Sequence, residues 1–308
     1  MKNKKLVGPN RGPLGYLLLI PSSILILVIS FYPLLNGIYL SFTNRNFINP
    51  LQNDFIFLDN YARLMKDSEF FSVLGFTFTY TASVVLISYL FGLGLALVLN
   101  RDMKFRGVYR ALVLIPWVIP SVVVANMWSW ILNDQLGILN NTLRNLGIID
   151  KPILFFSTAE MSRISVTFVS AWRAIPFMAV TILSGLQGIP SDMYEAAEID
   201  GAGFWKSLWY MTLPLIKQVS FISMTLMFIW TFNNFENIWL LTRGGPNNAT
   251  YVLSILSYFT GFFRSFISYA ATIAVMMLIV MLLLSLLFIK LLNIDDIDKI
   301  VKGEVKND

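Results

Sequence analysis

The sequence predicts an all-α membrane protein with six transmembrane helices. Its 308 residues are 56% hydrophobic and only 13% charged, whereas a soluble globular domain has about 25% charged residues. The apolar residues also gather in long runs with few or no charges, and a helix that crosses a bilayer needs ~20 such residues. We therefore expect lipid, rather than water, to surround most of the chain.

Six runs are long enough to span a bilayer. Arg173 interrupts the fourth. The first is too long for the ~7–15-residue core of a signal peptide, so we expect it to remain as a helix. A transmembrane domain, 14–291, then lies between an N-terminal segment, 1–13, and a C-terminal tail, 292–308. The predicted spans are Leu14–Leu40, Phe71–Leu99, Ala111–Ile131, Ile164–Leu186, Val219–Leu241 and Tyr269–Leu291.

The distribution of lysine and arginine predicts how these spans are oriented. With six spans, both termini share one side with the second and fourth connections. That side holds fourteen basic residues and the opposite side holds eight. Because cytoplasmic loops are richer in Lys and Arg, both termini and the fourth connection, Gly188 to Gln218, are expected in the cytoplasm. The same distribution accounts for the formal charge of +5 without a nucleic-acid partner.

Several kinds of catalytic site are excluded by what the sequence lacks. The chain has no cysteine and no histidine, which excludes disulfides, thiolate nucleophiles, histidine-bearing metal sites and Ser-His-Asp triads. It also lacks the G-x-x-x-x-G-K-[ST] loop that cradles nucleotide phosphates. No span carries the paired carboxylates of an intramembrane enzyme. We expect neither enzymatic activity nor a metal or cofactor in this chain.

The fourth connection is predicted to form a helix, a sharp turn and a second helix. Residues 195–218 have the sequence EAAEIDGAGFWKSLWYMTLPLIKQ. Asp192 is an expected N-cap with Glu195 three residues later in a capping box, and Gly201 suits the left-handed conformation that ends a helix. Aromatic residues then give the second helix an apolar side. Such a segment would press into a cleft on a soluble subunit and transmit movement to the attached spans.

This stretch resembles the EAA loop of binding-protein-dependent ABC importer permeases, whose pattern is EAA, two residues, DGA and a hydrophobic stretch ending in LP. The family often has a further proline where Gln218 stands here. The resemblance implies the type I ABC importer permease fold and a separate ATPase subunit that binds ATP and Mg²⁺. It also implies that the matching residues couple the two chains. They are Glu195, Ala196, Ala197, Asp200, Gly201, Ala202, Leu213 and Pro214.

Further short motifs resemble carbohydrate-type permeases of the maltose and glycerol-phosphate branch. They are Phe42-Thr43-Asn44, Leu58-Asp59-Asn60-Tyr61, Leu64, Arg110, Pro116-Trp117, Trp172-Arg173, Pro176-Phe177, Leu241-Thr242 and Gly244-Gly245-Pro246. This resemblance implies a sugar or oligosaccharide as the solute and a multi-pass location in a bacterial plasma membrane. The implied partners are a second permease subunit that is a distinct homologous chain, two ATPase subunits, and an extracellular or periplasmic solute-binding protein.

Polar side chains inside the spans are candidates for the solute pathway. A charged residue at the bilayer centre costs ~2.5–3.5 kcal/mol on insertion scales, which makes it a functional candidate. Arg173 and Glu236 fall in the outer halves of the fourth and fifth spans, where they either pair or line the path. Amides supply donors and acceptors without charge, and aromatic faces stack on sugar rings. The candidates around Glu236 are Asn233, Asn234 and Trp239, within a cluster that also includes Asn237.

Two alternatives to this interpretation follow from the same residues. The amide cluster also suits hydrogen bonding between neighbouring helices. An ion-gradient-driven secondary transporter of a polar solute would need an intramembrane proton or cation site, for which Glu236 is the lone acidic candidate. Inverted repeats are common in such transporters, and none is evident in this sequence.

Overall fold

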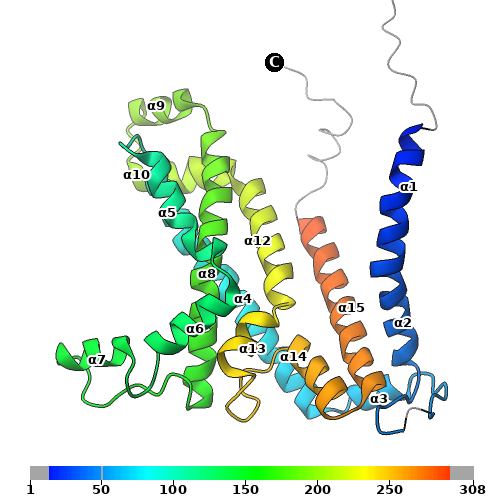
Figure 1. Ribbon diagram of the computed structural model, residues 1–308. Coiled ribbons are helices and arrows are strands. Elements are labelled where there is room, and N and C mark those ends of the chain that lie inside the picture. The colour runs from blue at the N-terminus through cyan, green and yellow to red at the C-terminus, as the bar shows by residue number, and fades with distance from the viewer. Residues whose placement is uncertain (1–13, 50, 292–308) are drawn as a thin grey trace, which may run out of the picture. The chain divides into compact units, whose positions relative to one another are not determined.

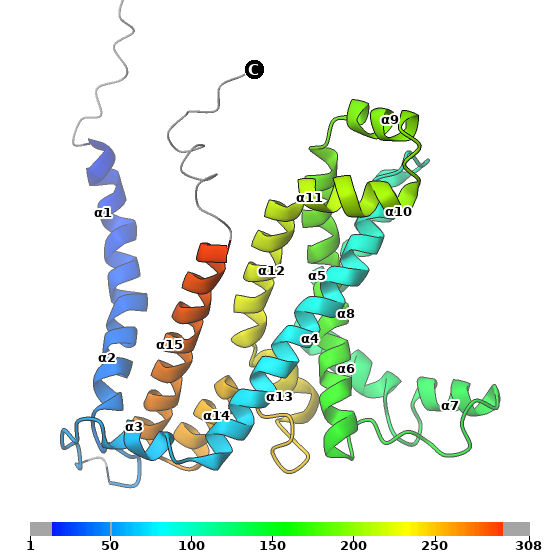
Figure 2. The ribbon, with the colours of Figure 1, turned by 180° about the vertical axis from the view of Figure 1, so that it is seen from behind.

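The computed structural model describes residues 14–49 and 51–291. The described chain contains many helices and no β-strand beyond an isolated bridge between Thr43 and Phe55. It divides into two compact units, whose elements are labelled in Figures 1 and 2. The first unit lies within residues 1–66 and 259–275, and the second within 67–258 and 276–308. The predicted N-terminal segment, 1–13, and tail, 292–308, lie outside the described residues.

The first unit contains the first hydrophobic span. Residues 17–41 form one helical run with mean hydropathy 2.3, interrupted only by a π-helical segment. The run lacks Lys, Arg, Asp and Glu, as a helix exposed to lipid requires. The elements of this unit are α1 (Leu14–Ile26), η1 (Leu27–Phe31), α2 (Tyr32–Ser41), α3 (Asp59–Leu64), η3 (Phe259–Phe263) and the first part of α15 (Ile267–Leu291).

A buried asparagine fastens the loop between α2 and α3 to the end of α2. The amide nitrogen of Asn60 donates to the carbonyl oxygens of Ser41 at 3.0 Å and Thr43 at 2.8 Å. The Thr43 hydroxyl lies 2.7 Å from that of Ser268 on α15. Buried polar groups require such partners. The conformation of this connection therefore depends on residues from two of the short motifs noted in the sequence.

The second unit contains the second to fifth predicted spans and most of the sixth. In both figures α9 lies at the C-terminal end of α8 and α7 lies at its N-terminal end, and these are called the α9 end and the α7 end below. The elements of this unit are α4 (Ser68–Leu99), α5 (Arg106–Val118), α6 (Ser121–Ile131), α7 (Ile138–Asn145), α8 (Ala159–Gln187), α9 (Ser191–Ile199), α10 (Phe204–Ser207), η2 (Leu208–Thr212), α11 (Leu213–Leu215), α12 (Lys217–Phe232), α13 (Glu236–Thr242), α14 (Leu253–Tyr258) and the rest of α15.

The two long helices α4 and α8 pack against each other and form the centre of the second unit. Both begin at side-chain caps: Asp67 accepts a hydrogen bond from the backbone nitrogen of Glu69, and Thr158 from that of Met161. Gly92 allows close approach, because a Cβ there would lie 2.6 Å from the Cβ of Met178. Small residues at helix interfaces have this role in membranes, where no hydrophobic force drives helices together.

The third predicted span is broken near its middle. α5 and α6 meet at an angle of 90°, with Ile119 and Pro120 between them in extended conformations. Proline disfavours the helical conformation for the residue before it and removes one backbone donor. The predicted span from Ala111 to Ile131 therefore consists of two helices that meet at Pro120.

The fifth predicted span is also interrupted. α12 ends at Phe232, and α13 begins at Glu236 after a three-residue break. The side chain of Asn234 accepts a hydrogen bond from the backbone nitrogen of Asn237 at 3.1 Å. Asparagine side chains compete in this way with helical hydrogen bonds. The prediction of continuous helix from Val219 to Leu241 missed this break.

Four described helical runs are each long and apolar enough to cross a membrane. The number rises to six if each bent pair counts as one span. One pair is α5 with α6, and the other joins residues 204–215 to α12 at 69°. The length and composition of the described helices therefore agree with the predicted all-α, six-span membrane fold.

Candidate functional site

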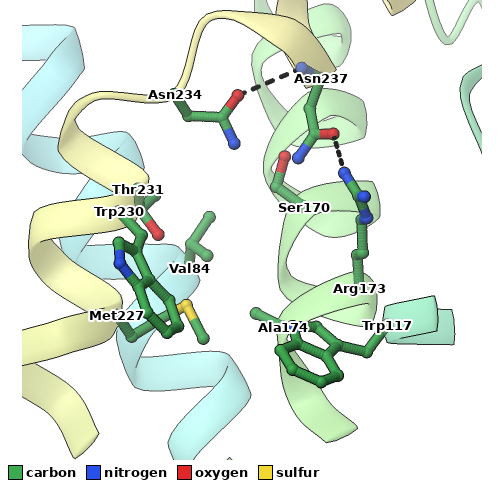
Figure 3. Close-up of a pocket in the computed structure, with 10 residues that line it drawn as sticks. All are labelled: Val84, Trp117, Ser170, Arg173, Ala174, Met227, Trp230, Thr231, Asn234 and Asn237. Carbon is green, nitrogen blue, oxygen red and sulfur yellow. Dashed lines mark hydrogen bonds between the residues drawn. The ribbon is translucent and has the colours of Figure 1, made fainter. Parts of the chain in front are cut away.

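A cavity of about 170 Å³ lies in the second unit, at the level of the break between α12 and α13. Figure 3 shows the side chains that line it. They come from α4, α5, α8, α12, the break and α13. The lining residues are Val84, Trp117, Ser170, Arg173, Ala174, Met227, Trp230, Thr231, Asn234 and Asn237.

One side of the cavity is polar. A terminal guanidinium nitrogen of Arg173 donates to the side-chain oxygen of Asn237 at 2.7 Å. The backbone nitrogen of Asn237 in turn donates to the side chain of Asn234, and Figure 3 draws both bonds. This chain of contacts orients two amides and one cation around the same space. Among the described residues, the guanidinium of Arg173 contacts Asn237, and no ion pair joins it to Glu236.

The opposite side of the cavity is apolar and aromatic. Figure 3 shows Trp117, Met227 and Trp230 on the side away from the two asparagines. Phe177 contacts both indoles, with ring centres 6.1 Å from Trp117 and 4.9 Å from Trp230. An aromatic surface facing hydrogen-bonding groups suits a solute with one apolar face and several hydroxyls.

The remaining predicted pathway residues do not line this cavity. Asn233 is exposed, and its amide nitrogen donates to the carbonyl oxygen of Ile229 at 3.3 Å and contacts the sulfur of Met281 at 3.0 Å. Glu236 is exposed in the first turn of α13. The ring of Trp239 stacks on Phe235 with centres 5.4 Å apart.

Sequence reasoning missed four lining residues that carry polar or aromatic chemistry. Trp117 and Trp230 lie in apolar runs, and their orientation toward a cavity cannot be inferred when lipid also surrounds those helices. The orientation of Ser170 and Thr231 toward a cavity could not be inferred for the same reason. The amide cluster did provide a signal for Asn237, which was named there without a role in the pathway.

The segment between α8 and α12 forms a second candidate site. α9 ends at a left-handed glycine, as predicted: Gly201 has a φ of +72°. Its backbone nitrogen donates to the carbonyl oxygen of Glu198 at 3.0 Å, and that of Ala202 donates to Ala197 at 2.9 Å. These two bonds make a Schellman motif, which satisfies the last carbonyls of the helix.

The start of α9 differs from the prediction. Pro190 occupies the N-cap position, and no side chain caps the helix. Asp192 lies in the first turn instead, where its negative charge still interacts favourably with the helix dipole. The expected capping box between Asp192 and Glu195 was therefore wrong. Proline before a helix supplies the extended conformation that the box would have fixed.

Much of the surface of this segment is open to solvent. The four acidic residues of α9 and its C-cap are exposed, as are Ala196 and Gly201. In the following helix Trp209 is 63% and Tyr210 is 84% exposed, whereas Leu208 is buried. The expected apolar side therefore faces outward and has no covering element in the described chain. The exposed acids are Asp192, Glu195, Glu198 and Asp200.

A hollow of about 470 Å³ separates this segment from the C-terminal end of α4. It extends from Asn100 and Arg101 to Phe204. The hydroxyl groups of Tyr194 and Thr212 lie 3.3 Å apart and connect α9 to η2. The segment therefore forms a hairpin whose two arms are in contact. Its ends continue into α8 and α12.

Comparisons with known proteins agree with this geometry. Residues 88–293 match the family described as "Binding-protein-dependent transport system inner membrane component". The chain is 35% identical, over 80% of its length and 82% of the relative's, to the trehalose/maltose transport system permease protein MalF of Thermococcus litoralis. Its fold resembles that of a chain in the crystal structure of a bacterial ABC transporter involved in the import of the acidic polysaccharide alginate. The TM-score is 0.79 at 22% sequence identity, and the match covers 91% of this chain and 94% of that one. A second structure of an alginate transporter, in complex with a pentasaccharide-bound periplasmic protein, matches with a TM-score of 0.76, 22% identity and coverage of 89% and 92%.

Proposed function

Because the chain belongs to the inner membrane components of binding-protein-dependent transport systems, and is thus a transmembrane subunit of an ABC importer, we propose that it forms half of the pathway for a sugar or oligosaccharide. The observation that carries this proposal is the cavity at the break in the fifth span. It combines two indoles with two amides and a guanidinium. Trehalose and maltose, which the archaeal relative is named for, are the first solutes to test.

The cavity suits a solute that must be released again. Neutral amides make hydrogen bonds worth only about 0.5–1.5 kcal/mol each, and the indoles of Trp117 and Trp230 add contact with the apolar face of a sugar ring. Its volume of about 170 Å³ is below the ~300–1,000 Å³ of common ligand pockets. We propose that a second permease subunit, a distinct homologous chain, supplies the other wall.

The alternative of ion-coupled transport has little support from this cavity. Of the described residues that line it, Arg173 alone is charged. Glu236, the acidic candidate for a proton or cation site, is exposed in α13 and is not among the lining residues. An ATPase partner is the better proposal for the source of energy.

We propose that the hairpin of α9 to α11 docks on the ATPase subunit. Its exposed carboxylates suit a basic or polar groove, and its exposed aromatic rings suit a hydrophobic cleft. The connections to α8 and α12 would transmit a rigid-body movement directly to the cavity walls. The proposed coupling residues are those of the EAA pattern: Glu195, Ala196, Ala197, Asp200, Gly201, Ala202, Leu213 and Pro214.

The proposed orientation places this hairpin and both termini in the cytoplasm. The assembly would contain two permease subunits and two ATPase subunits, and ATP and Mg²⁺ would bind to the latter. An extracellular or periplasmic protein would deliver the solute at the α7 end. Nucleic acid has no role in this proposal.

The pathway is tested by replacing one asparagine of the break at a time. Asn234→Ser retains a side-chain oxygen near the backbone nitrogen of Asn237 but withdraws the amide from the cavity. We expect uptake of maltose or trehalose by the assembled transporter to fall about three- to tenfold, the equivalent of one hydrogen bond. The matched control is Asn233→Ser, outside the lining, which should leave uptake unchanged. Equal uptake by both variants and the wild type would argue against a pathway at this cavity.

A further inference from the structure

A groove between α4 and α8 is separate from the pathway cavity. Its volume is about 430 Å³. The walls are apolar, with Phe76 and Ile87 on α4 and Ile164 and Phe168 on α8. The last two side chains are 53% and 49% exposed. The groove is therefore open on a pair of helices that belong to a membrane-spanning domain.

The two threonine hydroxyls along the groove are satisfied within their own helices. Thr79 donates to the carbonyl oxygen of Phe76 at 3.0 Å, and Thr167 donates to that of Arg163 at 2.6 Å. Such groups present little polarity to an occupant, since their hydrogens already have acceptors. The groove therefore suits a hydrocarbon better than a sugar.

One end of the groove carries a cation. The Nε of Arg163 donates to the carbonyl oxygen of Ala249 at 2.7 Å, and its guanidinium carbon lies 4.9 Å from the ring centre of Phe76. Within residues 14–49 and 51–291, no hydrogen-bond acceptor contacts either terminal nitrogen of this exposed side chain. A guanidinium with two terminal nitrogens available matches the paired oxygens of a phosphate.

The length of the groove matches one leaflet of a bilayer. It runs along α4 from Phe76 to Ile87, eleven residues or ~16 Å at 1.5 Å per residue, and half of a ~30 Å hydrocarbon core is ~15 Å. Arg163 is the fifth residue of α8, so it lies only ~6 Å from the start of that helix. An arginine near a helix end reaches the headgroup region readily.

We propose that this groove binds a glycerophospholipid, with the phosphate at the terminal nitrogens of Arg163 and one acyl chain between α4 and α8. The Tyr80 ring lines the groove, and its hydroxyl donates to Ser170, which lines the pathway cavity, at 2.8 Å. The lipid would therefore lie one hydrogen bond away from the wall of the solute pathway.

The occupant of the groove can be identified by photocrosslinking. The variant Phe168→p-benzoylphenylalanine places a photoreactive ketone on the groove wall in the assembled transporter, reconstituted in phosphatidylglycerol vesicles. Illumination should yield adducts that carry the mass of the lipid. Adducts that instead contain peptides from the second permease, or from another part of this chain, would overturn the proposal.

The role of the cation is tested by native mass spectrometry of the whole transporter. We expect Arg163→Gln to weaken retention of phosphatidylglycerol about tenfold, as expected for the loss of a charge-assisted phosphate contact. Arg163→Lys also loses the Nε contact with Ala249 but keeps the charge, so it should stay within about threefold of the wild type. The matched control Arg144→Gln, on α7, should have no effect. Equal retention by the wild type and Arg163→Gln would contradict phosphate binding.

Discussion

At the scale of single residues, the hairpin depends on one backbone conformation. Gly201 has a φ of +72°, and no atom lies within 4 Å of the position that a Cβ would take there. A substitution at Gly201 would therefore strain the backbone without creating a clash with neighbouring atoms. The strain of an L-residue in the left-handed region is roughly 1–2 kcal/mol. Gly203, two residues later, has a φ of −71° and also has open space.

These two glycines give a matched pair of variants. We expect Gly201→Ala to reduce solute-stimulated ATPase activity and uptake of the assembled transporter severalfold, because the Schellman turn loosens and the hairpin no longer transmits movement as one body. Gly203→Ala should leave both activities near the wild-type level. Similar losses in the two variants would show that the turn has no special role in coupling.

The sequence identified some residues of the cavity for clear physical reasons. Arg173 and Asn234 were candidates because a charge or an amide inside an apolar run requires a compensating partner. Trp117 and Trp230 were missed because an aromatic residue in a membrane span is equally suited to lipid, to a neighbouring helix or to a solute. Asn233 and Glu236 are neighbours in sequence of the lining residues Asn234 and Asn237, but they do not line the cavity.

At the scale of secondary-structure elements, the α4–α8 contact organises the second unit. A Cβ at Gly92 would lie 2.6 Å from the Cβ of Met178 and 3.0 Å from the backbone nitrogen of Ala179. Neither is the flexible end of a side chain, so the helices would have to separate. Gly94 lies on the same helix with nothing within 4 Å of such an atom.

The contact predicts opposite effects for two substitutions on one helix. Gly92→Ala should destabilise the folded protein by about 1–3 kcal/mol, the range for overpacking, and lower its melting temperature. Gly94→Ala should leave the melting temperature unchanged or raise it slightly, because alanine is the better helix former. The eight tryptophans of the chain allow the melt to be followed by intrinsic fluorescence in detergent. A lower melting temperature for Gly94→Ala than for Gly92→Ala would contradict the packing.

Long helices were easier to predict than their interruptions. α4 has 32 residues, so its apolar pattern extends well beyond the ~20 residues needed for a span. The breaks were harder because hydropathy averages over them. A proline such as Pro120 disfavours helix at the residue before it, but it does not by itself predict a 90° bend. The break at 233–235 involves amide contacts that depend on the folded arrangement.

At the scale of the whole molecule, the chain is one subunit of a transport system. Its family is one of transport permeases, and its cavity and hairpin are both surfaces that we propose other subunits complete. The balance of Lys and Arg predicts the side of the membrane on which the hairpin lies. The proposed mechanism requires the hairpin to lie on the cytoplasmic side, because ATP is available only in the cytoplasm.

The most direct test is the accessibility of the hairpin from each side of the membrane. The chain has no cysteine, so Ala196→Cys on exposed α9 and Thr142→Cys on exposed α7 each introduce a unique thiol. With a membrane-impermeant maleimide, we predict that intact cells label only Thr142→Cys. Inverted vesicles should label Ala196→Cys, and much less so when the ATPase subunit is present. Labelling of Ala196→Cys from outside intact cells, or equal labelling with and without the ATPase, would contradict the proposed docking site.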